Sequence, residues 1–573
     1  MDTWLQAFTG IDPTVVQVYQ AILRYAMPAL VLLLLVRAVR PLLTFRREPE
    51  IWAWLIPQSG KRLPITHWES VIGRSKRSDV VIEIPTVSRN HAVLTRYDDG
   101  SWTIADADSK SGVLVNGKKI DICALEPEDE INIGGLALTF LPITRKQEII
   151  LSQLRTKAAK PMDSVANVFL LTLIQFLCCL SYLMAGNSAH LTDILTGFAG
   201  IAVCQWLLLI FYLCIRKASF EVETVAFLLC TMGMAAIAAV KPGETVKQLA
   251  AVALGLVLFL AVGWALRDLE RAKRLKIIAG VAGVGLLLVT LLFGKEYHGA
   301  KNWLIIGGLS IQPSELSKVC FVFIGAATMD RIMNRKNLIL FIAYTLAVCA
   351  CLAVMNDFGT ALIFFVAFLL IAYMRSGSVG TIALACTSLG FAGVLALKIA
   401  PHALRRFTSW RHIWENPLTT GYQQTRALMC VASGGLFGLG AGRGWMRHVF
   451  AADSDVVFAS LSEEWGLLIC VMLVLCVIVF ALFALRCAAV GRSSFYTIGA
   501  CTASGILLVQ TILNVLGTVD ILPLTGVTFP FVSNGGSSMM CAWGLLAFVK
   551  AADTRQNASF AVRQSKEGRQ ELE

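Results

Sequence analysis

The chain has 573 residues, of which 56% are hydrophobic and only 15% are charged, and this composition excludes a single soluble domain. The formal net charge of +12 does not indicate a nucleic-acid partner, because many of the cations stand in short loops between apolar runs, where they set membrane topology. The 16 cysteines are scattered, mostly inside apolar runs, and lack the spacing of a metal site, so they indicate core or lipid-facing residues.

The N-terminal region, residues 1–46, contains an apolar run at 16–43 that is long enough for one spanning helix, a transmembrane anchor. Arg37 and Arg40 stand near the end of this run and two arginines follow it at 46–47, which predicts that the helix ends in the cytoplasm.

Residues 50–143 are more polar than the N-terminal run and contain short segments in which apolar and polar residues alternate. The pair Asn116-Gly117 separates Val113-Leu-Val115 from Lys118-Lys-Ile120, which is a strong hairpin signal. Short strands at such spacing predict a β-sandwich. A polar linker at 144–160, expected to be largely helical, connects it to the rest of the chain.

Beyond Pro161 the chain contains a long series of apolar segments. They lie near 164–185, 191–215, 221–240, 246–266, 274–294, 314–332, 338–355, 359–375, 379–400, 457–486, 495–517 and 530–550. With the N-terminal span, they predict about 13 transmembrane helices. The fold class is therefore mixed: a polytopic all-α membrane protein with a cytoplasmic β-sandwich. Two additional helices occupy 161–218, the main membrane domain occupies 219–552, and 553–573 is predicted to be a disordered tail.

Cations in the short loops support one threading of these spans. They occur at Arg216/Lys217, Arg267–Lys276, Arg331–Lys336, Arg375, Arg486/Arg492 and Lys550–Arg569, all on the side of the β-sandwich. This side is predicted to be the cytoplasm, with the N-terminus outside and the C-terminus inside.

The segment 401–455 is the exception, because it must lie outside and yet is rich in arginine, including Arg426, Arg443 and Arg447. Long loops cross membranes regardless of charge, so one interpretation is a solvated loop. The other is a cationic surface that faces an anionic lipid-linked substrate at the outer leaflet.

The segment 522–538 combines Pro, Gly and hydroxyl residues between two apolar runs. Backbone that cannot form a regular helix is costly at membrane depth unless it is buried in protein or lines a wet cavity. This segment is therefore predicted to be a shaped re-entrant loop.

Three segments of the β-sandwich stand out: Gly73-Arg74-Ser75, Ser88-Arg89-Asn90-His91 and the stretch 106–117. In order and spacing they resemble the forkhead-associated (FHA) module, which binds phosphothreonine. The resemblance implies that Arg74, Ser88, Arg89, Ser111 and Asn116 form the phosphothreonine site, while His91 braces a loop. Ser111 stands where the family usually has Asn, and Val113 where it has Thr. The alternative is a sandwich that serves as a docking surface.

Five separated parts of the membrane domain stand out: 299–303 with 312–318, 357–360, 421–423 with 433–438, 455–459 with 463–466, and 522–538. In this order they resemble the SEDS family (shape, elongation, division, sporulation) of FtsW/RodA-type peptidoglycan polymerases. The departures are Asn302 in place of Arg, Asn356 in place of Pro and Asn534 in place of Tyr. The resemblance implies a SEDS-type core of ten helices within residues 219–552.

The resemblance also implies an enzyme, a peptidoglycan glycosyltransferase that polymerises lipid II at the outer face of the bacterial plasma membrane. Asp455 matches the family's catalytic aspartate and ends the cationic loop, with Asp453 as the competing carboxylate. The expected substrate-binding residues are Lys301, Glu315, Lys318, Arg426, Arg443, Arg447 and Ser533. A class B penicillin-binding protein is the implied partner, besides a phosphothreonine protein. No metal ligands are assigned, and a role for a divalent cation such as Mg²⁺ stays open.

Some of these residues have a second interpretation. Glu315 and Lys318 are spaced i and i+3, so they can form a structural ion pair instead of a headgroup site. Glu463 and Glu464, about two turns inside a predicted span, should point about 100° apart and so not face one cavity. Two other functions also fit the sequence: a lipid II flippase, and a non-enzymatic scaffold that recruits phosphoproteins.

Overall fold

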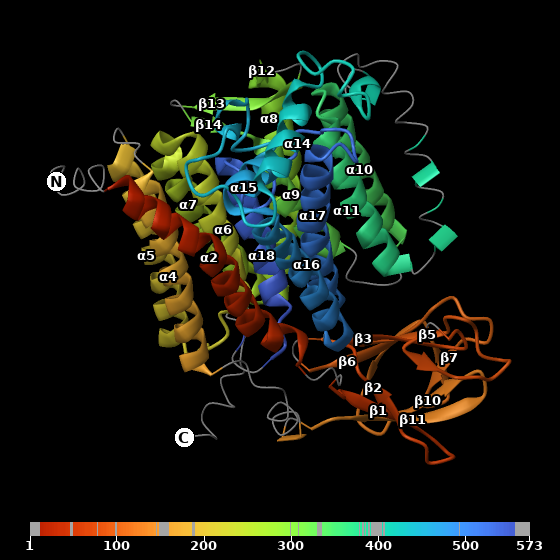
Figure 1. The fold of residues 1–573 in the computed structure, drawn as a ribbon. Coiled ribbons are helices and arrows are strands. Elements are labelled where there is room, and N and C mark those ends of the chain that lie inside the picture. Colours follow the sequence, from red (N-terminus) through yellow and green to blue (C-terminus); the bar gives the residue numbers. More distant parts are fainter. Residues whose placement is uncertain are drawn as a thin grey trace.

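The structure is a computed structural model of the whole chain. It describes residues 12–45, 50–76, 78–97, 100–144, 146–147, 160–185, 190–297, 300–306, 309–328, 335–376, 379–380, 407–491 and 493–555, with isolated positions between 383 and 404 and at 558. A β-sandwich follows the first helix, and a bundle of long helices makes up most of the remainder (Figure 1).

The predicted β-sandwich is present and has two sheets. One has six strands in the order β2-β1-β11-β10-β7-β8, and the other has five in the order β4-β3-β5-β6-β9. The strands are β1 (Ala53–Pro57), β2 (Leu63–Ile65), β3 (Glu69–Gly73), β4 (Val80–Val81), β5 (Ala92–Arg96), β6 (Trp102–Asp106), β7 (Val113–Val115), β8 (Lys118–Ile120), β9 (Ile122–Leu125), β10 (Glu130–Ile133) and β11 (Leu136–Pro142). Both sheets contribute to one buried core, which includes Leu55, Ile72, Ile104 and Phe140.

The predicted hairpin is confirmed in its register, since Val113 pairs with Ile120 and Val115 pairs with Lys118. Its two central residues, Asn116 and Gly117, have φ of 50° and 78°, as a tight hairpin turn requires.

Ten helices in the described part of the chain are long and apolar enough to cross a membrane. They are α2 (Pro13–Leu43), α4 (Pro161–Met184), α5 (Leu191–Cys214), α6 (Glu221–Val240), α7 (Thr245–Leu266), α8 (Leu269–Phe293), α10 (Arg335–Val354), α11 (Phe358–Ser376), α16 (Leu467–Val490) and α17 (Ser494–Thr518). Two shorter helices of 16 residues, α9 (Pro313–Thr328) and α18 (Gly536–Ala551), pack among them. Most of the predicted span at 379–400 and most of the linker at 144–160 lie outside the described residues.

Two boundaries differ from the prediction. The span predicted at 457–486 is broken at Gly466 into α15 (Val457–Trp465) and α16, because Gly466 adopts φ of 90°, which a helix does not allow. The prediction also places the start of the C-terminal tail, at residue 553, too early in the sequence. Asp553 and Arg555 are buried, because Arg555 pairs with Asp553 at 2.8 Å and with Glu221 of α6 at 3.4 Å. Residues 559–573 lie outside the described part.

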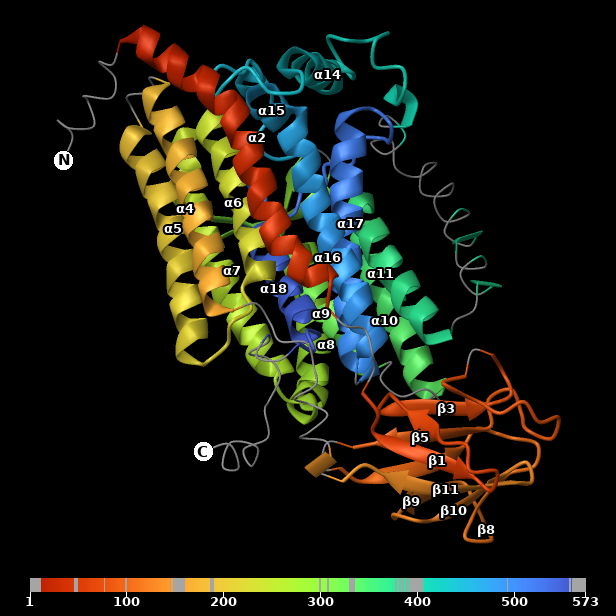
Figure 2. The same cartoon turned by 60° about the horizontal axis from the view of Figure 1, so that its bottom comes forward.

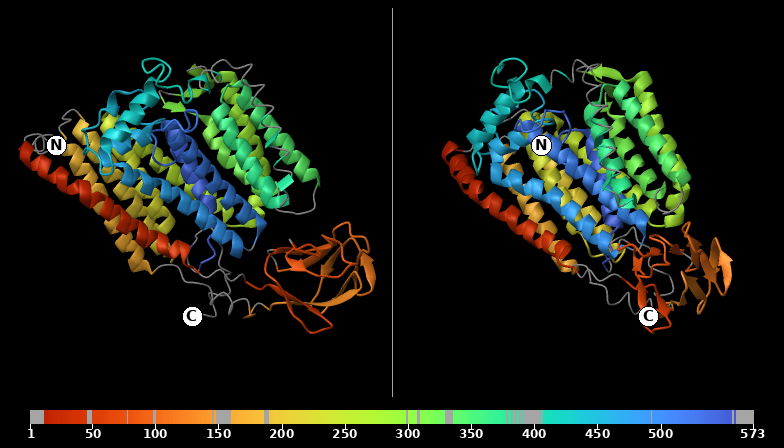
Figure 3. Two further views of the ribbon diagram at one scale, coloured as in Figure 1. Left: turned by 45° about the vertical axis from the view of Figure 1, so that its right-hand side comes forward. Right: turned by 90° about the vertical axis from the view of Figure 1, so that its right-hand side faces the viewer.

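The β-sandwich lies beyond one end of the bundle, next to the ends of α11 and α17 (Figure 2). An ion pair joins them there, since Arg375 of α11 lies 3.7 Å from Glu69 of β3. The loops that precede α15 gather at the opposite end of the bundle, where α2 also begins (Figure 3). We call this opposite end the distal end. A small sheet of β12 (Lys295–Tyr297), β13 (Ala300–Ile306) and β14 (Leu309–Ile311) also lies there (Figure 1).

The predicted re-entrant loop is irregular backbone from about residue 522 to residue 535, before α18 begins. Its side chains at Phe529, Phe531 and Val532 are buried. Gly233 of α6 allows this close approach, because a Cβ there would collide with the carbonyl of Val532. The second half of the loop, residues 529–533, is thus buried in protein, which is one of the two situations that irregular backbone at membrane depth requires.

Candidate active site at the distal end

The distal loop, residues 407–456, contains helix α14 (Tyr422–Gly434) and the short helix η3 (Met446–His448). Its glycine-rich part packs directly on α15, where the Leu439 N–H donates to the carbonyl of Glu463 at 2.8 Å. A Cβ on Gly434 or Gly438 would collide with the backbone of α15. These glycines therefore serve close backbone packing, which fixes the loop against the break at Gly466.

Glu463 and Glu464 hold the next part of the loop. Oε2 of Glu463 accepts the N–H of Met446 at 2.8 Å, and Oε1 of Glu464 accepts the N–H of Gly444 at 3.3 Å. The two carboxylates bond different groups, and of the two only Glu464 lines the pocket beside α2, so the expectation that they do not face one cavity is not contradicted. Both are buried.

Asp455 lies where the distal loop meets the re-entrant loop. A Cβ on Gly526 would lie 3.5 Å from Oδ2 of Asp455, so the carboxylate lies over the re-entrant backbone. The carbonyl of Asp455 accepts the side-chain amide of Asn514 at 2.9 Å, and the same amide donates to the carbonyl of Val527 at 2.8 Å. Asn514 thereby ties the two loops together from inside α17. Asp455 is only half-buried, so its carboxylate can meet a ligand.

Ser533 holds the same junction. Its hydroxyl donates to the carbonyl of Ser454 at 2.7 Å and accepts the N–H of Phe529 at 2.8 Å. The side chain is buried, so these contacts favour a role in shaping the loop. Its contact with substrate stays a prediction.

Asp453, the competing carboxylate, is placed differently. Its Oδ2 accepts Nζ of Lys241 at 3.0 Å and Nδ2 of Asn534 at 2.6 Å, and its side chain is buried. The same Asn534 amide donates to Glu244 at 2.7 Å. Asp453 therefore links the distal loop to the turn between α6 and α7.

The predicted arginines lie on the distal loop in different surroundings. Arg443 and Arg447 are exposed. Arg426 is partly buried, and its guanidinium lies 5.3 Å from the ring centroid of Tyr422 and 5.9 Å from that of Trp445. Aromatic contacts of this kind stabilise a cation without neutralising it. The distal loop thus presents cationic side chains at the distal end of the bundle.

The loop is also anchored at the end of α17. Oδ1 of Asp520 accepts the N–H of Arg411 at 3.4 Å and Nε2 of Gln424 at 3.3 Å. The pKa of Asp520 is raised above its ordinary value because partial burial disfavours the charged carboxylate. The N–H and the charge of Arg411 offset only part of this effect.

The other predicted substrate residues make internal contacts. Nζ of Lys301 donates to the carbonyl of Leu291 at 2.7 Å, at the end of α8. Lys318 and Glu315 form an ion pair of 2.7 Å, with side chains that are 1% and 7% exposed. The i, i+3 pairing is therefore confirmed, whereas a headgroup site at these residues stays a prediction.

Asp357 caps α11, since its Oδ1 accepts the N–H of Thr360 at 3.1 Å. Its Oδ2 accepts the side-chain amides of Asn302 at 3.1 Å and Gln312 at 3.3 Å. The stretches 299–303, 312–318 and 357–360 therefore meet at one carboxylate. The sequence analysis did not identify Asn514, which joins the distal loop to the re-entrant loop. A side-chain amide inside an apolar span is the signal that could have identified it.

The predicted phosphothreonine residues lie on adjacent loops of the β-sandwich. The Arg74 N–H donates to the carbonyl of Ser88 at 3.0 Å, and Oγ of Ser88 accepts the N–H of Lys110 at 3.0 Å. Arg74, Arg89 and Ser111 are exposed, so the two guanidinium groups and a hydroxyl are available to a ligand. The arrangement suits a phosphate dianion, which needs an Arg fork and hydroxyl or backbone donors.

His91 supports this surface from within, and Asn116 lies exposed at the β7–β8 hairpin. Nδ1 of His91 accepts the N–H of Ser88 at 3.0 Å, so Nε2 carries the proton that is donated to the carbonyl of Gly112 at 3.1 Å. The ring is buried, as a loop brace should be. The side chain of Asn116 donates to Asp129 at 2.8 Å and accepts the N–H of Glu130 at 3.0 Å, and its contact with a phosphothreonine ligand stays a prediction. Asn116 shapes the hairpin.

Within the described ranges, no three His, Cys, Asp or Glu side chains are grouped so that they could hold a metal ion.

Comparisons with known proteins agree with both resemblances. Residues 238–558 match the family FtsW/RodA/SpoVE, described as cell cycle protein, and residues 70–134 match the FHA domain. The chain is 29% identical to the peptidoglycan glycosyltransferase RodA of Mycobacterium tuberculosis over 315 residues, 52% of this chain and 67% of that protein. It is 32% identical to the probable peptidoglycan glycosyltransferase FtsW of Tolumonas auensis over 306 residues, 51% of this chain and 79% of that protein.

One similar solved structure is titled "Structural coordination of polymerization and crosslinking by a peptidoglycan synthase complex". The match covers 59% of this chain and 98% of the chain in that structure, with 22% identity and a TM-score of 0.49. The family match alone covers residues 238–558, more than half of the chain, and it contains Asp455, the re-entrant loop and the distal loop. The chain is therefore a multi-pass membrane protein that belongs to the FtsW/RodA/SpoVE family and carries an FHA domain.

Proposed function

We propose that this protein is a peptidoglycan glycosyltransferase that polymerises lipid II at the outer face of the bacterial plasma membrane. The observation that carries the proposal is the position of Asp455, whose half-buried carboxylate lies over Gly526 at the junction of the cationic distal loop and the re-entrant loop. Relatives named as peptidoglycan glycosyltransferases support it.

The chemistry suits these residues. In lipid II polymerisation, the 4-hydroxyl of an acceptor GlcNAc attacks C1 of a donor MurNAc and expels undecaprenyl diphosphate. The hydroxyl is a poor nucleophile and benefits from a general base, which Asp455 supplies. The leaving diphosphate needs cationic stabilisation more than a proton, and Arg443 and Arg447 supply it. One carboxylate with several cations differs from the paired carboxylates of glycosidases.

The test is glycan-strand formation from purified lipid II by the purified protein, with and without a class B penicillin-binding protein whose transpeptidase site is blocked. The expected result is polymer. Movement of lipid II across vesicle membranes without polymer would favour a flippase. Absence of both activities would favour a scaffold that recruits phosphoproteins.

The proposed orientation places the FHA domain and the C-terminus in the cytoplasm and the distal loop outside. Lys118→Cys on the β7–β8 hairpin and Leu436→Cys on the distal loop are matched probes, since both positions are exposed. In intact cells, an impermeant maleimide is expected to label Leu436→Cys above the background of the unsubstituted chain. Labelling of Lys118→Cys is expected only after lysis, and its labelling in intact cells would reverse the orientation.

The FHA domain is proposed to bind a phosphothreonine protein through Arg74, Ser88 and Arg89. The β-sandwich has its own core, so residues 50–144 can be studied alone. Arg74→Ala is expected to weaken binding of phosphothreonine peptides by about 2 kcal/mol, because a charge-assisted pair is lost. Lys118→Ala, on the hairpin, is the control and should bind normally. Calorimetry with phosphorylated and unphosphorylated peptides measures both, and equal weak binding of the two peptides would instead indicate a docking surface.

A further inference from the structure

Three spanning helices, α2, α4 and α5, lie wholly before the segment that matches the family, residues 238–558, and α6 overlaps that segment only at its last residues. We call α2, α4 and α5 the accessory helices. They pack on the family core, and two of them reach the distal loop (Figure 2). This raises the question of what the accessory helices contribute to the site.

The contact from α4 runs through Tyr182. Its buried hydroxyl donates to Oε2 of Glu464 at 2.7 Å and accepts the indole N–H of Trp465 at 3.0 Å. The other carboxylate oxygen of Glu464 accepts the N–H of Gly444 at 3.3 Å. A continuous chain of hydrogen bonds therefore joins α4 to the backbone of the distal loop.

The loop segment held in this way lies between two exposed arginines. Gly444 follows Arg443, and Met446, whose N–H bonds Glu463, precedes Arg447. Gly444 leaves no room for a side chain, because a Cβ there would lie 2.9 Å from Oε2 of Glu463 and 3.0 Å from Cγ of Glu464. The two glutamates thus clamp the backbone that carries both cations.

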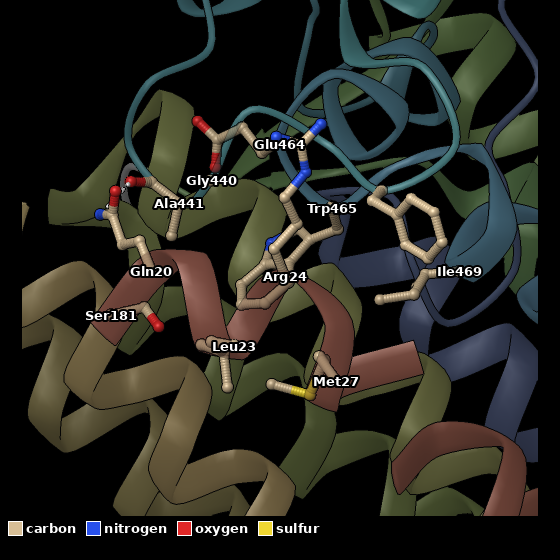
Figure 4. Close-up of a pocket in the computed structure, with 11 residues that line it drawn as sticks. Gln20, Leu23, Arg24, Met27, Ser181, Gly440, Ala441, Glu464, Trp465 and Ile469 are labelled. Atoms are coloured by element: carbon tan, nitrogen blue, oxygen red, sulfur yellow. Dashed lines mark hydrogen bonds between the residues drawn. The ribbon is translucent and has the colours of Figure 1, made fainter. Parts of the chain in front are cut away.

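The contact from α2 reinforces the same loop. Nε2 of Gln20 donates to the carbonyl of Ala441 at 3.3 Å, and the ring of Tyr25 lies 5.0 Å from that of Phe437. Gln20 and Arg24 line one pocket with Ala441 and Glu464 (Figure 4).

We propose that Tyr182 and Glu464 are positioning residues, which fix the backbone at 443–447 so that Arg443 and Arg447 are presented to the diphosphate of the lipid-linked substrate. The accessory helices are then part of the substrate site. The inference rests on the proposed function. A loop ordered before the substrate binds avoids the entropy cost of ordering it during binding, so the effect should be on substrate affinity.

Tyr182→Phe removes the hydroxyl and little else. The expected result is a roughly tenfold rise in KM for lipid II with kcat nearly unchanged, since a hydrogen bond to a charged group is lost. In an Arg443→Ala, Arg447→Ala background, Tyr182→Phe should add little, because the cations that it positions are gone.

Tyr212→Phe is the matched control. Tyr212 is buried on α5, also an accessory helix, and donates to Glu223 at the same distance, 2.7 Å, but Glu223 bonds Lys550 and not the distal loop. It should leave KM unchanged. Equal effects of Tyr182→Phe and Tyr212→Phe on KM, or no effect of Tyr182→Phe, would overturn the proposal.

Hydrogen exchange of the full-length protein gives a readout that does not depend on activity. Tyr182→Phe should speed exchange at residues 440–447 and leave the β-sandwich unchanged. Unchanged exchange at residues 440–447 would contradict the proposal that Tyr182 and Glu464 fix the loop backbone, even if KM rose. Absence of polymer from the unsubstituted protein would overturn the proposed function instead, and exchange would still decide whether Tyr182 orders the loop.

Discussion

Asp455→Asn is expected to lower glycan polymerisation by about 10²–10⁴-fold, the usual contribution of a general base. The substitution keeps the size of the side chain and removes its basicity. The backbone contact from Asn514 to the carbonyl of residue 455 does not depend on the side chain, so the junction of the two loops should persist. The measurement is glycan-strand formation from lipid II by the protein purified together with a class B penicillin-binding protein whose transpeptidase site is blocked.

Asp453→Asn is the natural control for this substitution, because it lies two residues away and makes the same chemical change. Its carboxylate is engaged by Lys241 and Asn534, so its loss should affect activity far less. Near-normal polymer from Asp455→Asn would place the base elsewhere. A comparable loss from both variants would mean that the fold of the junction, and not the basicity of Asp455, had been tested.

Lys318→Met is expected to destabilise the membrane domain by about 3–5 kcal/mol, because it leaves Glu315 as a buried charge without its cation. The pair is 2.7 Å apart and almost fully buried, so water cannot compensate. Thermal unfolding in detergent, followed by the loss of monodisperse protein, measures the effect as a lower midpoint.

The double substitution Glu315→Leu with Lys318→Met separates the two interpretations of this pair. Replacing both members of a buried ion pair by apolar residues is often neutral or stabilising, so the double variant should regain stability. If the pair is structural, the double variant should also regain polymerisation. A stable double variant without activity would instead assign Glu315 and Lys318 to the substrate site.

The sequence by itself determined the elements whose signals are local. Apolar runs of about 20 residues predict spanning helices because the thickness of the bilayer sets their length, and the Asn116-Gly117 turn sets its own hairpin register. The irregular backbone of the re-entrant loop followed from its Pro and Gly content. The break at Gly466 was missed because an apolar run has the same composition whether the helix continues or stops.

The tertiary structure decided which side chains meet. Asp453 and Asp455 are two residues apart and chemically alike, yet one is buried against Lys241 and Asn534 while the other lies over Gly526. Glu464 contacts Tyr182, 282 positions earlier in the sequence. Such contacts depend on how helices pack, and packing is set by the summed fit of many side chains. A local sequence pattern does not determine this packing, so the partners of a buried carboxylate can be identified only in the folded structure.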